Sequence, residues 1–459
     1  VNDIKADLHD KNTAYVVLDN HKFGDYKPYL FMTEDGGKSW KSITKGLPEG
    51  TLLWRIVQDH VNPNLLFLGT EYGVYISLNR GKSWDKFSTG LPTIPVRDLA
   101  IQKRENDLVL ATFGRSFYVL DDYSALRDLD NELMKKDGHI FKPRKALQYN
   151  QIYGGTSSDG GQTYYAKNPA YGANIKFYIK DAPKSLKQKR KKAEKENMDF
   201  VGWEALDNEM SEQKNQSILV VKTKDGEVVS KISNPLKKGI NNINWSLSSS
   251  IPTTVKSGSN SRYSRGVYTQ VKEGKYDLFL YTRIDGAVSE VAGPVELEVE
   301  KIRKGTLQNP LSDQHSDYYK KLAETFTKVE LLEHKIEKAS DRVDTYQSVL
   351  MGLKNDINES SKLVFDLVET KNKLERKIGG SESKKEVGEK DNLTVYDRLW
   401  SARGGWYSNS YGPTALHMRS YDIAKKMLER LEPEISDYLS KVDKVGKILE
   451  EAGAPIVLD

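Results

Sequence analysis

Two segments near the N-terminus repeat each other at a constant offset of 44 residues, and this repeat restricts the fold more than any other feature. They are Thr33-Glu-Asp-Gly-Gly-Lys-Ser-Trp40 and Ser77-Leu-Asn-Arg-Gly-Lys-Ser-Trp84, and each is followed by a Gly-Leu-Pro sequence. Short apolar, strand-like runs precede them at Tyr29–Met32 and Val74–Ile76. A period of about 40–45 residues with several short strands per unit is typical of β-propeller blades. The repeat therefore predicts propeller blades in residues 1–125.

The shared positions of the two segments have a mechanical interpretation. They are Asp35, Gly37, Ser39 and Trp40 in the first segment and Asn79, Gly81, Ser83 and Trp84 in the second. Asp35 and its counterpart can accept hydrogen bonds from the backbone of their own turn, as short Asx side chains do. The glycines suit backbone positions that a side chain would strain. We expect both tryptophans to close their hairpins by packing beneath them.

The pattern Ser/Thr-x-Asp-x-Gly-x-Ser/Thr-Trp resembles the Asp box, or BNR repeat, of sialidase-like and sortilin-like propellers. The first segment matches at every position, whereas Asn79 departs from the pattern and should weaken its turn without abolishing it. Residues 96–122 are similar to the closing strands of large bacterial BNR propellers, which are often labelled glycosyl hydrolases. The resemblance implies the C-terminal part of such a protein, secreted or located in the cell envelope (the periplasm or the cell surface).

The repeat region is too short to close a propeller by itself. About 125 residues at 44 per blade give fewer than three blades, and a propeller needs about four to close. An open propeller also leaves unpaired sheet edges. We therefore expect upstream blades, from the same protein or from a cleaved chain, to be partners of this one. The chain begins at Val1 with no signal-peptide pattern, and we expect a fragment or a processed chain.

The rest of the chain predicts two further domains, so that the fold class is a multidomain, mainly β plus α protein. Residues 126–145 are interpreted as a linker and 146–305 as an immunoglobulin- or fibronectin-like β-sandwich, with hairpin turns at Asp225-Gly226 and Asp285-Gly286. A basic insertion at 184–196 is expected to be exposed and mobile. A patch for an anionic polysaccharide, a lipid headgroup or nucleic acid is the alternative for it, although no aromatic residue is interleaved for base stacking.

Near-heptad apolar spacing in residues 306–459 predicts an antiparallel bundle of three or four helices. We expect the first helix to break near Ser340 or Gly352. Residues 379–391 are interpreted as a mobile, charged loop, and Pro433 is expected to start or kink the last helix.

The sequence offers no constellation that is specific to catalysis. It has no cysteine, which excludes disulfides, thiolate metal sites and a cysteine nucleophile. Its seven histidines form no HExxH pair, and neither a GxSxG elbow nor a Walker loop is present. We therefore predict no catalytic residue, no metal and no cofactor for this chain, and we do not expect it to be an enzyme by itself.

The resemblance to sialidase-like propellers raises one catalytic possibility. Sialidases clamp a substrate carboxylate with three arginines, and Arg55, Arg97 and Arg115 are the strand-associated arginines of the predicted blades. Arg55 and Arg97 occupy equivalent places before successive blades, which favours a structural role. The glycosyl hydrolase label is thus an analogy of fold, and a fold does not determine a function.

A Gly-rich segment late in the chain gathers four aromatic residues within 12 positions. The candidate contact residues there are Trp400, Arg403, Trp406, Tyr407 and Tyr411. They suit packing between the helices and a neighbouring module, or an aromatic platform for a glycan or a peptide.

Three functions remain open at this point. The first, which we favour, is a non-catalytic part of a secreted or envelope BNR propeller protein that binds a protein or a peptide. The second is a sialidase-like, carbohydrate-active enzyme whose catalytic residues lie in upstream blades. The third is a structural subunit of an envelope assembly. A net charge of only +5 argues against nucleic acid as a partner, and no run of 18 apolar residues predicts a membrane span.

Overall fold

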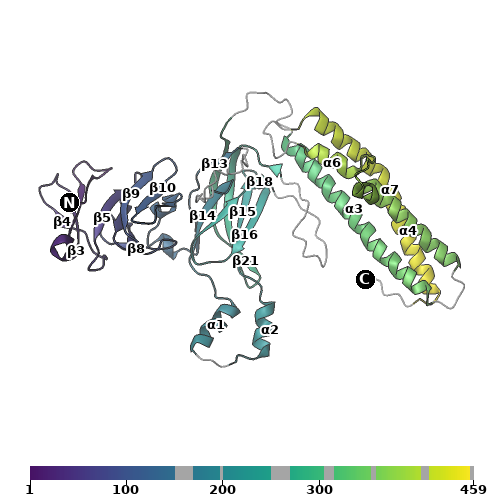
Figure 1. Cartoon of the computed structure of the whole chain (residues 1–459), viewed down its shortest axis with the longest axis horizontal. Coiled ribbons are helices and arrows are strands. Elements are labelled where there is room, and N and C mark those ends of the chain that lie inside the picture. Colours follow the sequence, from purple (N-terminus) through teal and green to yellow (C-terminus); the bar gives the residue numbers. More distant parts are fainter. Residues whose placement is uncertain are drawn as a thin grey trace.

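The computed structural model describes residues 1–149, 169–196, 200–249, 269–303, 315–352, 358–404 and 413–454. It confirms a mixed β and α chain. The N-terminal sheets, two central sheets and a group of long helices follow one another along the longest axis of the molecule (Figure 1).

The first 125 residues form three antiparallel sheets whose strands are neighbours in chain order. The first sheet contains β1 (Asp3–Ala6), β2 (Ala14–Asn20), β3 (Asp25–Thr33) and β4 (Lys41–Ser42). The second contains β5 (Leu53–Gln58), β6 (Leu66–Thr70), β7 (Gly73–Ser77) and β8 (Asp85–Phe87). The third contains only β9 (Val96–Gln102), β10 (Asp107–Thr112) and β11 (Phe117–Leu120), so that β11 is its outer strand.

The second sheet is packed between the other two. Because side chains alternate across a strand, Leu66 and Leu68 enter a core shared with the first sheet, whereas Phe67 enters a core shared with the third. Arg55 on β5 joins all three sheets, because its guanidinium binds Asp3 on β1 at 3.1 Å and Asp98 on β9 at 2.7 Å.

Two buried aspartates, Asp7 after β1 and Asp59 after β5, have matching environments. Each accepts backbone N–H bonds from the residues two and three positions later and a hydroxyl bond from a tyrosine. Each also binds an arginine from a later element, Arg80 for Asp7 and Arg127 for Asp59. These carboxylates connect successive parts of the N-terminal region.

The segment expected as a linker, residues 126–145, carries ordered structure. It includes the end of the 3-10 helix η2 (Tyr123–Arg127), the 3-10 helix η3 (Leu133–Lys135) and the strand β12 (Gly138–Ile140). Arg127 ties its start to Asp59, and Phe141 near its end is buried against Ala125 and Leu133. The segment is therefore a packed junction.

The two central sheets follow and share one core. The smaller has the order β12-β14-β17, with β14 (Ala173–Ile179) and β17 (Gly239–Trp245). The larger has the order β13-β21-β20-β15-β16, with β13 (Ala146–Gln148), β15 (Gln216–Thr223), β16 (Val228–Pro235), β20 (Gly274–Ile284) and β21 (Ala287–Lys301). A short pair, β18 (Ser248–Ser249) and β19 (Thr269–Gln270), lies beside them. The hairpins expected at Asp225-Gly226 and Asp285-Gly286 join β15 to β16 and β20 to β21.

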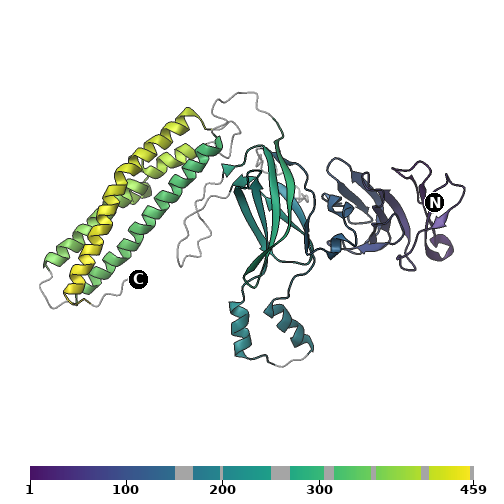
Figure 2. The ribbon, with the colours of Figure 1, turned by 180° about the vertical axis from the view of Figure 1, so that it is seen from behind.

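The basic insertion is helical. It forms α1 (Leu186–Glu196), which together with α2 (Trp203–Ser211) projects away from the central sheets in both views (Figures 1 and 2). Neither helix has a buried residue. The two are joined by Arg190, which binds Glu209 at 2.7 Å.

The C-terminal helices are α3 (His315–Leu350), α4 (Asn358–Gly379), α5 (Glu382–Glu386), α6 (Val395–Arg403) and α7 (Ala415–Glu451). Helices α3, α4, α6 and α7 contribute to one apolar core. Helix α3 runs unbroken through Ser340 and ends at Leu350, so the expected break lies near Gly352, the second of the two alternatives. Helix α7 continues through Pro433, and α5 occupies part of the segment expected to be a mobile loop.

Candidate functional site

The two repeated turns have the same hydrogen-bond geometry. In the first, Asp35 accepts bonds from the backbone N–H and the hydroxyl of Ser39, at 3.0 and 2.5 Å, and these bonds lower its pKa to about 2. The hydroxyl of Thr33 accepts the N–H of Gly37 at 2.9 Å. In the second, Asn79 accepts the backbone N–H of Ser83 at 2.9 Å, and its amide donates to the Ser83 hydroxyl at 2.8 Å. The Asn79 amide thus takes the place of the Asp35 carboxylate. The bond to the serine backbone is the same in both turns, whereas the serine hydroxyl donates to Asp35 but accepts from Asn79.

Trp84 of the second turn is buried against the first sheet. Its side chain is 3% exposed, and its indole N–H donates to the backbone carbonyl of Ile43 at 2.8 Å. Gly46, at φ +96°, lies so close that a Cβ there would sit 2.5 Å from the Trp84 carbonyl oxygen. The second turn therefore anchors its own sheet to the preceding one.

Trp40 does not pack as expected, because it is 43% exposed. The reason follows from Trp84, which is buried by the sheet before it rather than beneath its own hairpin. Among the described residues no sheet precedes the first one. Trp40 is therefore not buried as Trp84 is, although its ring lies 4.0 Å from the position that a Cβ of Gly37 would take in its own hairpin.

The difference between the two tryptophans extends over a whole row of side chains. In the second sheet Ile56, Leu68 and Tyr75 lie side by side across three strands, and all are less than 5% exposed against the first sheet. The corresponding row of the first sheet is Ile4, Val16 and Phe31. Here Ile4 is 64% exposed, and the other two are partly exposed. The outer face of the first sheet thus repeats, uncovered, the face that the second sheet buries. Hereafter the "outer face" means Ile4, Val16, Phe31 and Trp40.

The opposite end of the stack is also apolar. Phe113, Phe117 and Val119 of the third sheet and its hairpin are 70%, 72% and 54% exposed. Phe117 and Val119 lie on β11, which has no strand beyond it in the part of the chain that the structure describes. Both ends of the three-sheet stack therefore present apolar side chains to solvent.

The arginines considered for a carboxylate clamp have other contacts. Arg55 bridges Asp3 and Asp98, as described above. Arg97 lies over the ring of Trp54, 3.6 Å from its centroid, and 3.5 Å from the carboxylate of Glu71. Arg115 lies in the exposed turn before β11. The first two are thus engaged by acids of the chain itself.

The aromatic segment of the helical region is described only in part. Trp400 on α6 is 45% exposed and packs edge-on against Phe326 of α3, with 5.5 Å between ring centroids. The guanidinium of Arg403 lies 4.9 Å from the Trp400 centroid. Trp406, Tyr407 and Tyr411 lie outside the described residues. Of the five candidate contact residues, the structure therefore describes only the half-exposed Trp400 and the neighbouring Arg403.

The described residues hold no group of three or more metal-ligating side chains. Within the same residues, no helix has both the length and the apolarity for crossing a bilayer.

Comparisons with known proteins give little similarity. No family model matches the chain, and no curated protein matches it. Solved structures with a partial likeness include the GH74 xyloglucanase from Xanthomonas campestris, at 13% identity and a TM-score of 0.22 over 26% of this chain and 21% of that one. An ancestral GH74 enzyme matches 26% of this chain with 18% of its own, at 17% identity and a TM-score of 0.21. The match thus spans about a fifth of these structures, and a likeness this weak carries no inference about function.

Proposed function

We propose that this chain is a non-catalytic, protein-binding part of a larger repeat protein and that its outer face receives another sheet of the same kind. The observation that carries the proposal is the exposure of Trp40, whose counterpart Trp84 is buried by the preceding sheet. In this proposal the three N-terminal sheets are blades of an open β-propeller, and the two central sheets form an immunoglobulin- or fibronectin-like sandwich. On the motif resemblance, the whole protein is secreted or located in the cell envelope.

Physical chemistry supports an occupant for this face. A cluster of exposed aliphatic and aromatic side chains is the feature that marks interaction surfaces on soluble proteins. Burial of one large apolar side chain stabilises an interface by about 1.5–3 kcal/mol. The second sheet supplies a template for the occupant, because it satisfies the Trp84 indole with a backbone carbonyl of its neighbour. The occupant of the outer face would offer Trp40 a carbonyl in the same way.

The proposal can be tested by supplying the missing neighbour. A fusion that places an extra copy of residues 51–92 ahead of Val1 offers the outer face a sheet of this kind. In the fused chain, Trp40→Ala should cost about 3 kcal/mol of unfolding free energy, against less than about 1 kcal/mol in the unfused chain. Trp84→Ala is the matched control, since its cost should be large and equal in both chains.

Equal costs of Trp40→Ala in the two chains would contradict the proposal. In that case the outer face would not recognise a repeat sheet, and its exposed side chains would have another role.

A further inference from the structure

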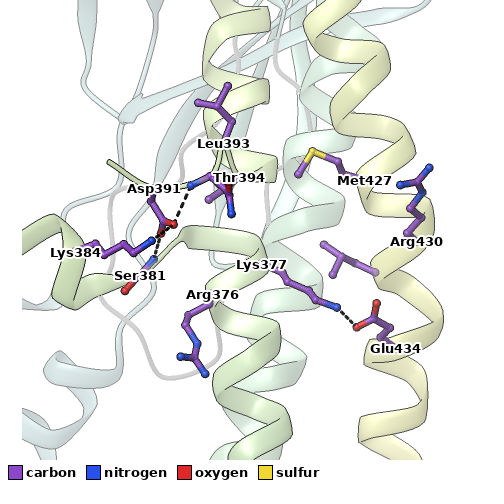
Figure 3. Close-up of a pocket in the computed structure, with 12 residues that line it drawn as sticks. Arg376, Lys377, Ser381, Lys384, Asp391, Leu393, Thr394, Met427, Arg430 and Glu434 are labelled. Atoms are coloured by element: carbon purple, nitrogen blue, oxygen red, sulfur yellow. Dashed lines mark hydrogen bonds and ion pairs between the residues drawn. The ribbon is translucent and has the colours of Figure 1, made fainter. Parts of the chain in front are cut away.

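The C-terminal helices contain a cavity of about 540 Å³ that is separate from the outer face. Figure 3 shows its lining, which comes from the last turns of α4, from residues 381–394 and from the middle of α7. This volume lies within the range of small-ligand and peptide-side-chain sites.

Both acids of the lining are already engaged. Asp391 accepts the backbone N–H of Ser381 at 2.8 Å and the ammonium of Lys384 at 3.1 Å. These contacts, with the backbone N–H of Asn392, lower its pKa to about 2. Glu434 on α7 binds Lys377 on α4 at 2.5 Å. The two carboxylates are therefore neutralised by the two lysines.

Two arginines remain as the surplus charge of the cavity. Arg376 lines it from α4 and Arg430 from α7 (Figure 3). Neither has a carboxylate within ion-pair distance in the described part of the chain. The Nε of Arg376 donates to the carbonyl of Asn372 at 3.0 Å, which holds the stem and leaves the terminal nitrogens available. Guanidinium groups with free terminal nitrogens are suited to binding carboxylates with two hydrogen bonds.

The remaining lining is apolar. Leu431 is buried in the helical core, Met427 is half-buried, and Leu393 at the rim is 56% exposed. An exposed leucine beside two uncompensated cations favours a ligand that is both anionic and apolar.

We propose that this cavity binds a short acidic peptide segment that carries an aliphatic side chain. Arg376 and Arg430 bind its carboxylates, and the aliphatic side chain lies against Leu393 and Met427. A peptide fits better than an anionic membrane surface, because the surplus charge is confined to two guanidinium groups in one cavity, which match a few carboxylates rather than a dense array of phosphates.

The test uses the full chain and a fluorescein-labelled pentapeptide of alternating aspartate and leucine, titrated by fluorescence anisotropy. We expect saturable binding that weakens about tenfold for each arginine removed in Arg376→Ala and Arg430→Ala. The matched control is Lys373→Ala/Lys425→Ala, which removes two positive charges from the same two helices outside the cavity. These lysines pair with Glu369 and Glu429 at 3.2 and 3.9 Å. Thermal melts of all variants verify the fold.

Four outcomes would overturn the proposal. The first is the absence of saturable binding, and the second is an equal loss of affinity in the lysine control. The third is preferential binding to vesicles of one part phosphatidylglycerol to three parts phosphatidylcholine, abolished by the arginine variants. A peptide with asparagine in place of aspartate should not bind, and one with serine in place of leucine should bind more weakly. Tight binding of the asparagine peptide would also contradict the assignment.

Discussion

Arg127 donates two hydrogen bonds, at 2.9 and 2.8 Å, to the carboxylate of Asp59, which lies 68 residues earlier in the chain. The Asp59 side chain is fully buried. Tyr123 donates its hydroxyl to the same carboxylate at 2.5 Å, and the backbone N–H groups of Val61 and Asn62 complete its environment. This cluster fixes the junction after the third sheet onto the second sheet.

The first prediction concerns removal of the arginine. Arg127→Met should lower the free energy of unfolding by about 3–5 kcal/mol, because it leaves a buried carboxylate without its cation. Urea denaturation followed by tryptophan fluorescence measures the loss. Arg104→Met, at an arginine that is 81% exposed, is the control and should change stability by less than about 1 kcal/mol. Similar costs for the two variants would show that the buried pair adds nothing to stability.

The second prediction concerns acid stability. Burial opposes ionisation of Asp59, but the bonds from Arg127, Tyr123 and the backbone outweigh it and hold its pKa below the ordinary value of 3.8. A carboxylate of this kind stabilises the fold above its unfolded pKa, and this contribution is lost as the pH falls through the folded pKa. We expect unfolding of the N-terminal region to become easier only below about pH 4. The variant Asp59→Asn/Arg127→Met should have a flatter dependence in this range, and an unchanged slope would contradict the assignment.

The third prediction compares the repeated tryptophans. Trp84→Ala should cost about 3–5 kcal/mol, as truncation of a large buried side chain does. Trp40→Ala should cost less than about 1 kcal/mol in this chain, because its side chain is 43% exposed. Denaturant melts of the two variants, made in parallel, decide this. A greater loss at Trp40 would mean that the outer face is covered within this chain.

The fourth prediction concerns the basic helix. Deleting Lys187–Lys195 should shift the melting temperature of the two central sheets by less than about 2 °C, because α1 buries no residue. Circular dichroism melts provide the measurement. Trp245→Ala, at a residue 1% exposed in the shared core, is the reference for a real loss. If the deletion lowers the melting temperature as much as Trp245→Ala does, then the helix is packed against a part of the protein.

Local patterns in the sequence predicted much of the β structure. The hairpin at Asp285-Gly286 forms because both residues adopt positive φ, at +49° and +84°, as a tight two-residue turn requires. The repeated turns form because Asp35 and Asn79 bond their own backbone, which depends on residues within four positions. Turns that are held by interactions within a few residues can therefore be predicted from the sequence alone.

Features that depend on distant parts of the chain were missed. Six strands, β6 to β11, lie between Asp59 and Arg127, so the local sequence around either residue does not predict their pairing. The exposure of Trp40 depends on which sheet lies beside it, although its motif matches the pattern at every position. The sequence left the end of α3 open between Ser340 and Gly352, because the choice depends on packing of Ile336 and Val343 in the shared core, which outweighs the modest helix propensity of serine. The cavity is lined by Arg376 of α4 and Arg430 of α7, which lie more than 50 residues apart in the chain.

The bridging position of Arg55 has a mechanical consequence. Its guanidinium holds a carboxylate of each neighbouring sheet, and Asp3 on one side also accepts the N–H of Ile56 at 3.1 Å. A pulling force applied to the first sheet is therefore transmitted through one side chain to the third. Nearest-neighbour contacts of this kind make repeats yield cooperatively. Under load, we expect the three sheets to rupture in a single step, whereas an Arg55→Ala chain should release them one after another.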